Sequence, residues 1–158
     1  MDIPSTIMGL GLLLVFIGPI GYLLVNQSVQ EKHRKKAIFE VAAKKELNLN
    51  RFDFLPDLSL GLDEEKDQFL VISFGKKKIT RVLDLKDISR CEIGKKYEGN
   101  KVSSAVDDIR EVTLVLDQKN APSETIVFYK EELHSVIEKE MRLQMANTWR
   151  GIISDRLQ

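Results

Sequence analysis

An uncharged apolar stretch near the N-terminus constrains this chain more than any other feature. The stretch covers residues 6–25 and reads TIMGLGLLLVFIGPIGYLLV, and no charged side chain occurs between Ile3 and Gln30. A helix of this length rises about 1.5 Å per residue and spans about 30 Å, which matches the hydrocarbon core of a bilayer. The sequence therefore predicts a single transmembrane helix, with a short external tail, over residues 1–26.

A signal peptide, a lipoprotein anchor and a buried core helix each fit the stretch less well. A cleaved signal peptide has a basic n-region and a small-x-small cleavage site, whereas the tail Met1–Ser5 carries an acid and no base. A lipoprotein needs a cysteine beside the apolar core, and Cys91 is the sole cysteine. A helix buried in a protein core is not expected to stay free of charge over this length. A permanent span remains the preferred interpretation.

Basic residues on one side of the span predict its orientation. The N-terminal tail has none, while the other side carries Lys32, Arg34, Lys35 and Lys36. Because basic residues near a span stay on the cytoplasmic side, we expect the N-terminus outside and the remaining chain in the cytoplasm of a single-pass inner or plasma membrane protein. The basic residues belong to a juxtamembrane helix or linker, residues 27–47, and are candidate contacts with the membrane surface. Alternatively, they serve as a topology signal alone.

Glycines inside the span form a second candidate surface. Gly11, Gly18 and Gly21 fall on one helical face, and small residues let a neighbouring helix approach closely. This face is a candidate packing surface for a homo-oligomer or a partner subunit. The alternative is that glycine is simply common in membrane helices, which gives the pattern no function.

The remaining residues, 48–158, suffice for one domain with a modest core. Lysine plus arginine equals aspartate plus glutamate, 24 each, so the formal net charge is zero. This balance argues against a nucleic-acid partner, because such domains are usually basic on one face.

Alternating hydrophobicity predicts six or seven antiparallel strands in this domain. The first predicted strand carries the alternating leucines 58, 60 and 62, and the acidic turn 63–67 follows it. Further strands are predicted over 68–74, 78–85, 88–94, 110–117 and 124–130. A polar segment, residues 94–108, is predicted as a loop, and residues 102–105 within it as a short strand. Short turns between neighbours favour successive hairpins.

The last segment is predicted to be an amphipathic helix that closes the sheet. Its apolar residues recur at three- and four-residue steps: Leu133, Val136 or Ile137, Met141, Met145, Trp149, Ile152 and Ile153. We expect the whole stripe to face the core, with Trp149 as its anchor and Arg150 toward solvent.

An antiparallel sheet closed by one C-terminal helix resembles a pleckstrin-homology-like (PH-like) domain, which implies an α+β fold. The whole chain also resembles a group of small single-span bacterial membrane proteins with a cytoplasmic domain of this kind. The stretches that carry this resemblance are 60–64 (LGLDE), 88–91 (ISRC), 127–129 (VFY) and 143–149 (LQMANTW). It implies no activity. The lysines 76–78 look like a phosphoinositide-binding hairpin but lack the arginine partner, and we interpret them as a solvated turn.

No catalytic, cofactor-binding or metal-binding motif stands out. His33 and His134 lie far apart, the acids 63–67 lack the glycine and final glutamate of a calcium loop, and Cys91 is expected to be a small core residue. We therefore expect no enzyme and no cofactor. The preferred hypothesis is a membrane-tethered interaction or scaffold module that contacts the lipid bilayer and a protein partner or another copy of the chain. The alternative is a lipid- or small-ligand-handling domain, or an enzyme, with a pocket that the sequence does not reveal.

Overall fold

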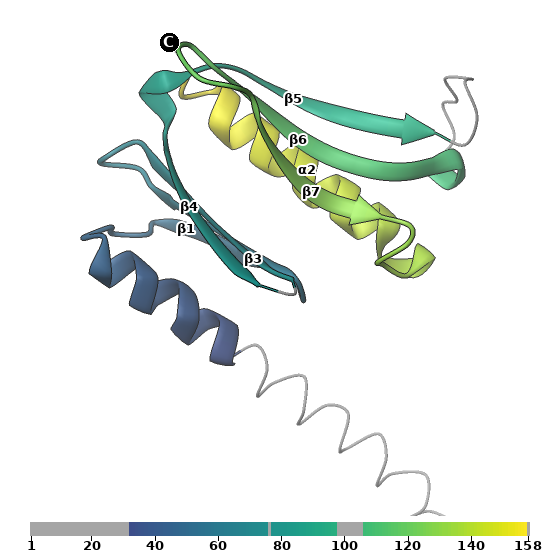
Figure 1. Ribbon diagram of the computed structural model, residues 1–158, viewed down its shortest axis with the longest axis horizontal. Coiled ribbons are helices and arrows are strands. Elements are labelled where there is room, and N and C mark those ends of the chain that lie inside the picture. The colour runs from purple at the N-terminus through teal and green to yellow at the C-terminus, as the bar shows by residue number, and fades with distance from the viewer. Residues whose placement is uncertain (1–31, 76, 98–105, 158) are drawn as a thin grey trace, which may run out of the picture.

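The computed structural model describes residues 32–75, 77–97 and 106–157 (Figure 1). These residues form an α+β fold with seven antiparallel strands in two sheets and a C-terminal helix, which confirms the α+β class, the antiparallel strands and the last helix of the prediction. The predicted span and its glycines, Gly11, Gly18 and Gly21, lie outside the described residues. None of the helices within the described ranges is both long enough and apolar enough to cross a membrane.

The first sheet contains four strands in the order β1-β2-β3-β4. Their bounds are β1 Arg51–Phe54, β2 Leu58–Asp63, β3 Gln68–Phe74 and β4 Lys78–Asp84. Strand β1 was not among the predicted strands, because its four residues carry only two apolar side chains, Phe52 and Phe54. The strands β2, β3 and β4 match the predicted hairpins closely.

A helix over residues 32–44 covers the outer face of this sheet (Figure 1). Its buried residues Ile38 and Ala42 pack against Leu70 and Ile72 of β3. The opposite face of β3 carries Phe69, which is buried in the main core. Both faces of β3 are therefore covered, which explains why its sequence is a continuous apolar run rather than an alternation.

The second sheet contains three strands in the order β5-β6-β7. Their bounds are β5 Ile88–Tyr97, β6 Ile109–Gln118 and β7 Glu124–Lys130, and the short 3-10 helices η1 Leu85–Asp87 and η2 Val106–Asp108 precede β5 and β6. Strand β5 continues through Lys95, Lys96 and Tyr97, which pair with β6. The predicted loop 94–108 is thus shorter than expected, because polar residues on a strand at the sheet edge can face water. The predicted short strand at 102–105 lies outside the described residues.

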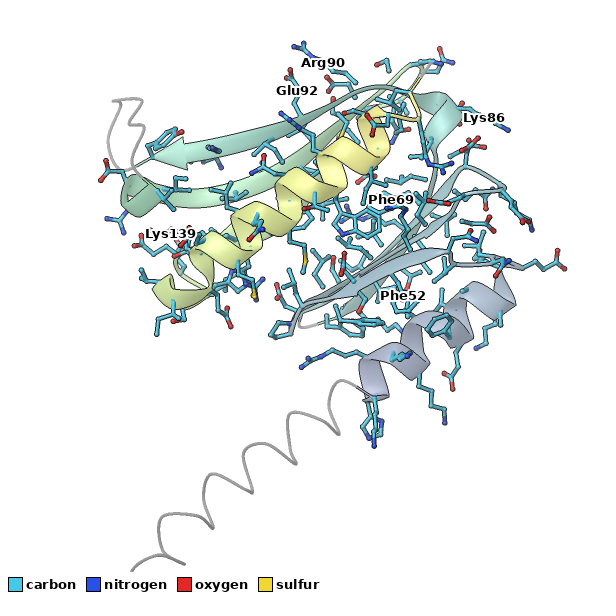
Figure 2. All side chains as sticks on the ribbon, turned by 180° about the vertical axis from the view of Figure 1, so that it is seen from behind. Phe52, Phe69, Lys86, Arg90, Glu92 and Lys139 are labelled. Atoms are coloured by element: carbon cyan, nitrogen blue, oxygen red, sulfur yellow. The ribbon has the colours of Figure 1, made fainter. Side chains whose placement is uncertain are left out.

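The C-terminal helix α2, Lys139–Ser154, lies against the second sheet on the side that faces the first (Figure 1). Trp149 is fully buried, and its ring lies 5.2 Å from the ring of Phe69 on β3. Figure 2 shows Phe69 in the space between the sheets and Phe52 on the opposite, helix-covered side of the first sheet. The helix therefore connects both sheets to one core, as the prediction for Trp149 required, and Arg150 is exposed as expected.

Candidate functional site

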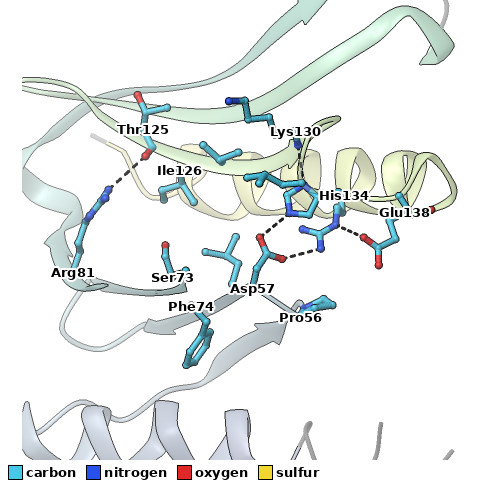
Figure 3. A pocket seen from close by; sticks show the side chains of 16 residues that line it. Pro56, Asp57, Ser73, Phe74, Arg81, Thr125, Ile126, Lys130, His134 and Glu138 are labelled. Carbon is cyan, nitrogen blue, oxygen red and sulfur yellow. Dashed lines mark hydrogen bonds and ion pairs between the residues drawn. The ribbon is translucent and has the colours of Figure 1, made fainter. Parts of the chain in front are cut away.

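A cleft of about 610 Å³ opens between the end of the first sheet, strand β7 and the turn that precedes α2 (Figure 3). Strand β3 contributes Ser73 and Phe74, strand β4 contributes Arg81, and β7 contributes Thr125, Ile126 and Val127. The turn between β1 and β2 supplies Pro56 and Asp57, and β2 begins with Leu58. These segments are distant in sequence, so the cleft exists only after both sheets have assembled.

A carboxylate held by two basic groups lies in the wall of the cleft. Oδ1 of Asp57 accepts a hydrogen bond from Nη2 of Arg142 over 2.8 Å, and its Oδ2 lies 2.9 Å from Nε2 of His134 (Figure 3). Burial by itself raises the pKa of Asp57, but the hydrogen bond and charge of Arg142, together with the bond from His134, outweigh it. The pKa of Asp57 is therefore lowered, and its side chain is an anion at neutral pH.

The partners of His134 define its protonation. The backbone N–H of Lys130 donates to Nδ1 over 2.8 Å, so Nδ1 is an acceptor and carries no proton. The proton of the neutral ring is consequently on Nε2, where it is donated to Asp57. Both ring nitrogens therefore have partners within the protein.

Arg142 is buried in the same network. Its side chain is only 1% exposed, Nη1 donates to the backbone carbonyl of Phe128 over 2.8 Å, and Nε donates to Oε2 of Glu138 over 3.1 Å. Two carboxylates and a carbonyl thus compensate for the desolvation of the guanidinium. This network joins α2, β7 and the β1–β2 turn, and its charged groups are engaged with one another.

An exposed apolar patch adjoins the cleft. The patch consists of Leu133, Val136, Ile137 and Met141, whose exposed fractions are 72%, 59%, 91% and 48%. Ile137 lies in the short 3-10 helix η3, Val136–Glu138, directly before α2. Large apolar side chains gathered on one surface segment are typical of sites where another molecule binds.

These exposed side chains correct the predicted stripe of the C-terminal helix. From Met145 onward the stripe follows the prediction, but its earlier members, from Leu133 to Met141, point to solvent. The inner face at the start of α2 is occupied by Lys139 and Arg142, which are buried. Lys139 places its Nζ 5.5 Å from the ring of Tyr129. Hydropathy assigns charged residues such as Lys139 and Arg142 to the surface. The prediction from apolar spacing therefore placed the buried face wrongly at the start of α2.

The basic residues predicted to contact the membrane surface lie at the start of the 32–44 helix. Lys32, Lys35 and Lys36 are exposed and Arg34 is half-buried. Lys36 lies 3.8 Å from Glu40, and Lys35 lies over the ring of Phe52. The structure brings these residues together on one helix; their contact with lipid stays a prediction.

Asp63, in the acidic turn between β2 and β3, is hydrogen-bonded to groups within the domain. The carboxylate of Asp63 accepts backbone N–H groups from Asn48, Glu65 and Lys66. Burial opposes ionisation, yet these bonds outweigh it and lower the pKa of Asp63. The turn thus fastens the segment after the 32–44 helix to the β2–β3 hairpin. Across the described residues, no group of three or more His, Cys, Asp or Glu side chains is arranged to hold a metal ion.

Cys91 is a buried residue on β5, as predicted. Burial raises the pKa of its thiol to about 11, so the reactive thiolate is scarce at neutral pH. The lysines Lys77 and Lys78 are exposed, in agreement with a solvated turn, and Lys76 lies outside the described residues.

Sequence reasoning missed the cleft and its network. The available signals were His134 and Asp57, but 77 residues separate them, and nothing in their spacing indicates contact. No family model, curated protein or solved structure matches this chain.

Proposed function

We propose that this protein is a membrane-tethered interaction module, in which a PH-like cytoplasmic domain binds a protein partner at the cleft and the adjoining apolar patch. The tether in this proposal is the apolar stretch 6–25, and the basic residues that follow it favour a cytoplasmic domain. A four-stranded sheet, a three-stranded sheet and one C-terminal helix in this order support the PH-like assignment.

The observation that carries the proposal is the exposure of the apolar patch. Ile137 is 91% exposed and Leu133 is 72% exposed, although both are large aliphatic side chains. Such groups favour removal from water by about 25 cal/mol for each Å² buried. A partner that covers the patch and inserts a side chain into the cleft gains this free energy.

The charged groups in the wall of the cleft are hydrogen-bonded to one another, and this favours binding over catalysis. His134 has partners on both ring nitrogens, and Asp57 is held by His134 and Arg142. A general acid or base must lie within hydrogen-bond reach of the proton that it transfers, and the side chain of His134 is only 6% exposed. In this cleft the charged groups instead support the shape of the binding surface.

Photocrosslinking in native membranes tests this proposal. A photoreactive amino acid replaces Ile137 in the full chain, and a matched variant carries it at Glu92, whose side chain is 54% exposed on β5. We expect a discrete protein adduct from position 137 and none from position 92. Adding Leu133→Glu is expected to abolish the adduct, because a charge on the patch cannot be buried without a partner.

The same experiment distinguishes protein binding from a second candidate function, the binding of a lipid or small ligand. A cleft of about 610 Å³ falls within the range of about 300–1,000 Å³ that small-molecule sites occupy, so a lipid or small apolar ligand is the alternative occupant. An adduct of less than about one kilodalton at position 137, with no protein adduct, favours this ligand-handling function. Equal protein adducts from positions 137 and 92, or none from either, contradict the interaction site.

A further inference from the structure

We propose that a second surface, on the opposite side of the first sheet from the main core, rests on an anionic lipid bilayer. This aromatic–basic surface is formed by Lys35 and Phe39 of the 32–44 helix and Phe52 of β1. The inference rests on the membrane tether in the proposed function and adds an orientation to it, because one defined face of the domain then lies against the lipid.

The aromatic side chains of this surface are half-exposed and held in place. Phe39 and Phe52 are 36% and 38% exposed, and their rings meet edge to face at 5.2 Å. Phe52 also lies 5.6 Å from the ring of Phe54, which packs against the second core cluster. Ile38, the neighbour of Phe39, is fully buried and fixes the helix to the sheet. The two rings are thus presented on a rigid support.

The helix that carries Phe39 is basic, and one of its lysines lies over the Phe52 ring. Nζ of Lys35 lies 5.6 Å from the centre of the Phe52 ring. Residues 32–45 contain six lysine or arginine residues and a single acid, Glu40. Aromatic rings that enter the headgroup region beside lysines that reach the phosphates are typical of interfacial membrane contacts. This charge pattern complements an anionic lipid surface.

The connection to the predicted span brings this surface within reach of the bilayer. Six residues lie between Val25 and Lys32, and the seven Cα–Cα steps of a fully extended chain cover at most about 25 Å. Phe39 lies about 10 Å further along the helix, at about 1.5 Å per residue. A helix that runs along the membrane surface therefore brings Lys35 and Phe39 to the headgroups.

The apolar patch beside the cleft differs in its charge. Acidic side chains flank it: Glu140 is exposed, Glu132 pairs with Lys130, and Glu138 pairs with Arg142, while Lys139 and Arg142 are buried. Exposed carboxylates are repelled by anionic headgroups. Charge therefore assigns the lipid to the aromatic–basic surface and leaves the patch for a protein partner.

Tryptophan quenching by brominated lipids tests the inference on the full chain in liposomes. Phe52→Trp places a probe on the proposed contact, and Val127→Trp places one at a position of equal exposure, 38%, beside the cleft. Trp149 is buried in both variants and provides the same background. In vesicles that contain anionic lipid, we expect the added signal at position 52 to be quenched at least threefold more strongly than that at position 127.

Two further variants keep the test decisive. Phe39→Trp should reproduce the quenching if Phe52→Trp disturbs the sheet, and Lys35→Glu combined with Lys36→Glu should reduce it. Equal quenching at positions 52, 39 and 127, or stronger quenching at 127, overturns the inference. Carbonate extraction examines the tether separately: release of the chain overturns the tether and the inference that rests on it, whereas a retained chain without selective quenching overturns the lipid contact alone.

Discussion

The indole Nε1–H of Trp149 donates a hydrogen bond to Oδ2 of Asp53 over 2.9 Å, across 96 residues of sequence. Asp53 lies on β1, the first strand of the domain, and Trp149 lies on α2, its last helix. The same indole packs on Phe69 of β3. One side chain thus joins the two ends of the domain through a polar and an apolar contact.

Substitutions of Trp149 should separate these two contributions. Trp149→Ala removes both contacts and is expected to lower the free energy of unfolding by about 3–5 kcal/mol. Trp149→Phe keeps an aromatic ring but leaves Asp53 without its donor, and is expected to cost about 1–3 kcal/mol. Thermal and denaturant unfolding of the detergent-solubilised chain measures both. Arg150→Ala is the control, with an expected change within about 0.5 kcal/mol, because Arg150 is exposed. A Trp149→Ala variant of unchanged stability would contradict the central packing role of the indole.

Contact between the 32–44 helix and the first sheet depends on Gly61. A Cβ atom at this position would lie 2.7 Å from Cδ1 of Leu49 and 3.2 Å from Cδ1 of Ile38. Gly61→Ala is therefore expected to displace the helix and to destabilise the domain by about 1–3 kcal/mol. Gly75→Ala is the matched control, since no atom lies within 4 Å of its Cβ position. Equal stability of the two variants, measured by thermal unfolding, would contradict the close helix–sheet contact.

Removal of Ile38 tests the same contact from the helix. Ile38 is fully buried among Leu70, Ile72 and Leu49. Ile38→Ala is expected to lower the free energy of unfolding by about 2–5 kcal/mol, because it leaves a cavity. Hydrogen exchange of the 32–44 helix should rise in parallel, whereas Glu40→Ala should leave it unchanged. For the same reason, a soluble chain that begins at Leu47 is expected to be less stable than one that begins at Lys32. If hydrogen exchange of the 32–44 helix were unchanged in Ile38→Ala, contacts other than those of Ile38 would hold the helix on the sheet.

Asp57 should stabilise the fold only while it is ionised. Asp57→Asn leaves the buried guanidinium of Arg142 with Glu138 as its remaining carboxylate and is expected to cost about 1–3 kcal/mol at pH 7. Because folding lowers the pKa of Asp57, its contribution is complete above the pKa of the unfolded chain, about 3.9, and is lost as the pH falls through the folded value. The stability difference between the wild type and Asp57→Asn should therefore shrink below about pH 4. A constant difference down to pH 2 would exclude Asp57 as its source.

The orientation of the chain can be tested by thiol labelling. A cysteine that replaces Gln158 is expected to resist an impermeant thiol reagent in intact cells and to react after lysis, because the basic residues after the span favour a cytoplasmic C-terminus. Cys91 is buried and gives little background. Labelling in intact cells would reverse the predicted topology.

Local pattern was enough to predict most strands and the core half of the last helix. Alternating apolar residues placed β2, β4, β6 and β7 within a residue or two of their observed bounds. The three- and four-residue spacing from Met145 to Ile153 matched the core-facing side of α2. These features depend on neighbours in sequence, because side-chain direction repeats every two residues in a strand and every 3.6 in a helix.

The candidate site depended on contacts that no local pattern encodes. Arg142 is buried only because Asp57, Glu138 and the carbonyl of Phe128 surround it, and 85 residues separate it from Asp57. Its burial leaves Ile137 and Met141 exposed, although their hydropathy predicted the opposite. The sequence alone determined an apolar stretch long enough to span a bilayer, its basic flank and an antiparallel domain. The tertiary structure decided which charges are buried and which apolar side chains face water, because that outcome depends on partners from distant segments that can offset the loss of hydration.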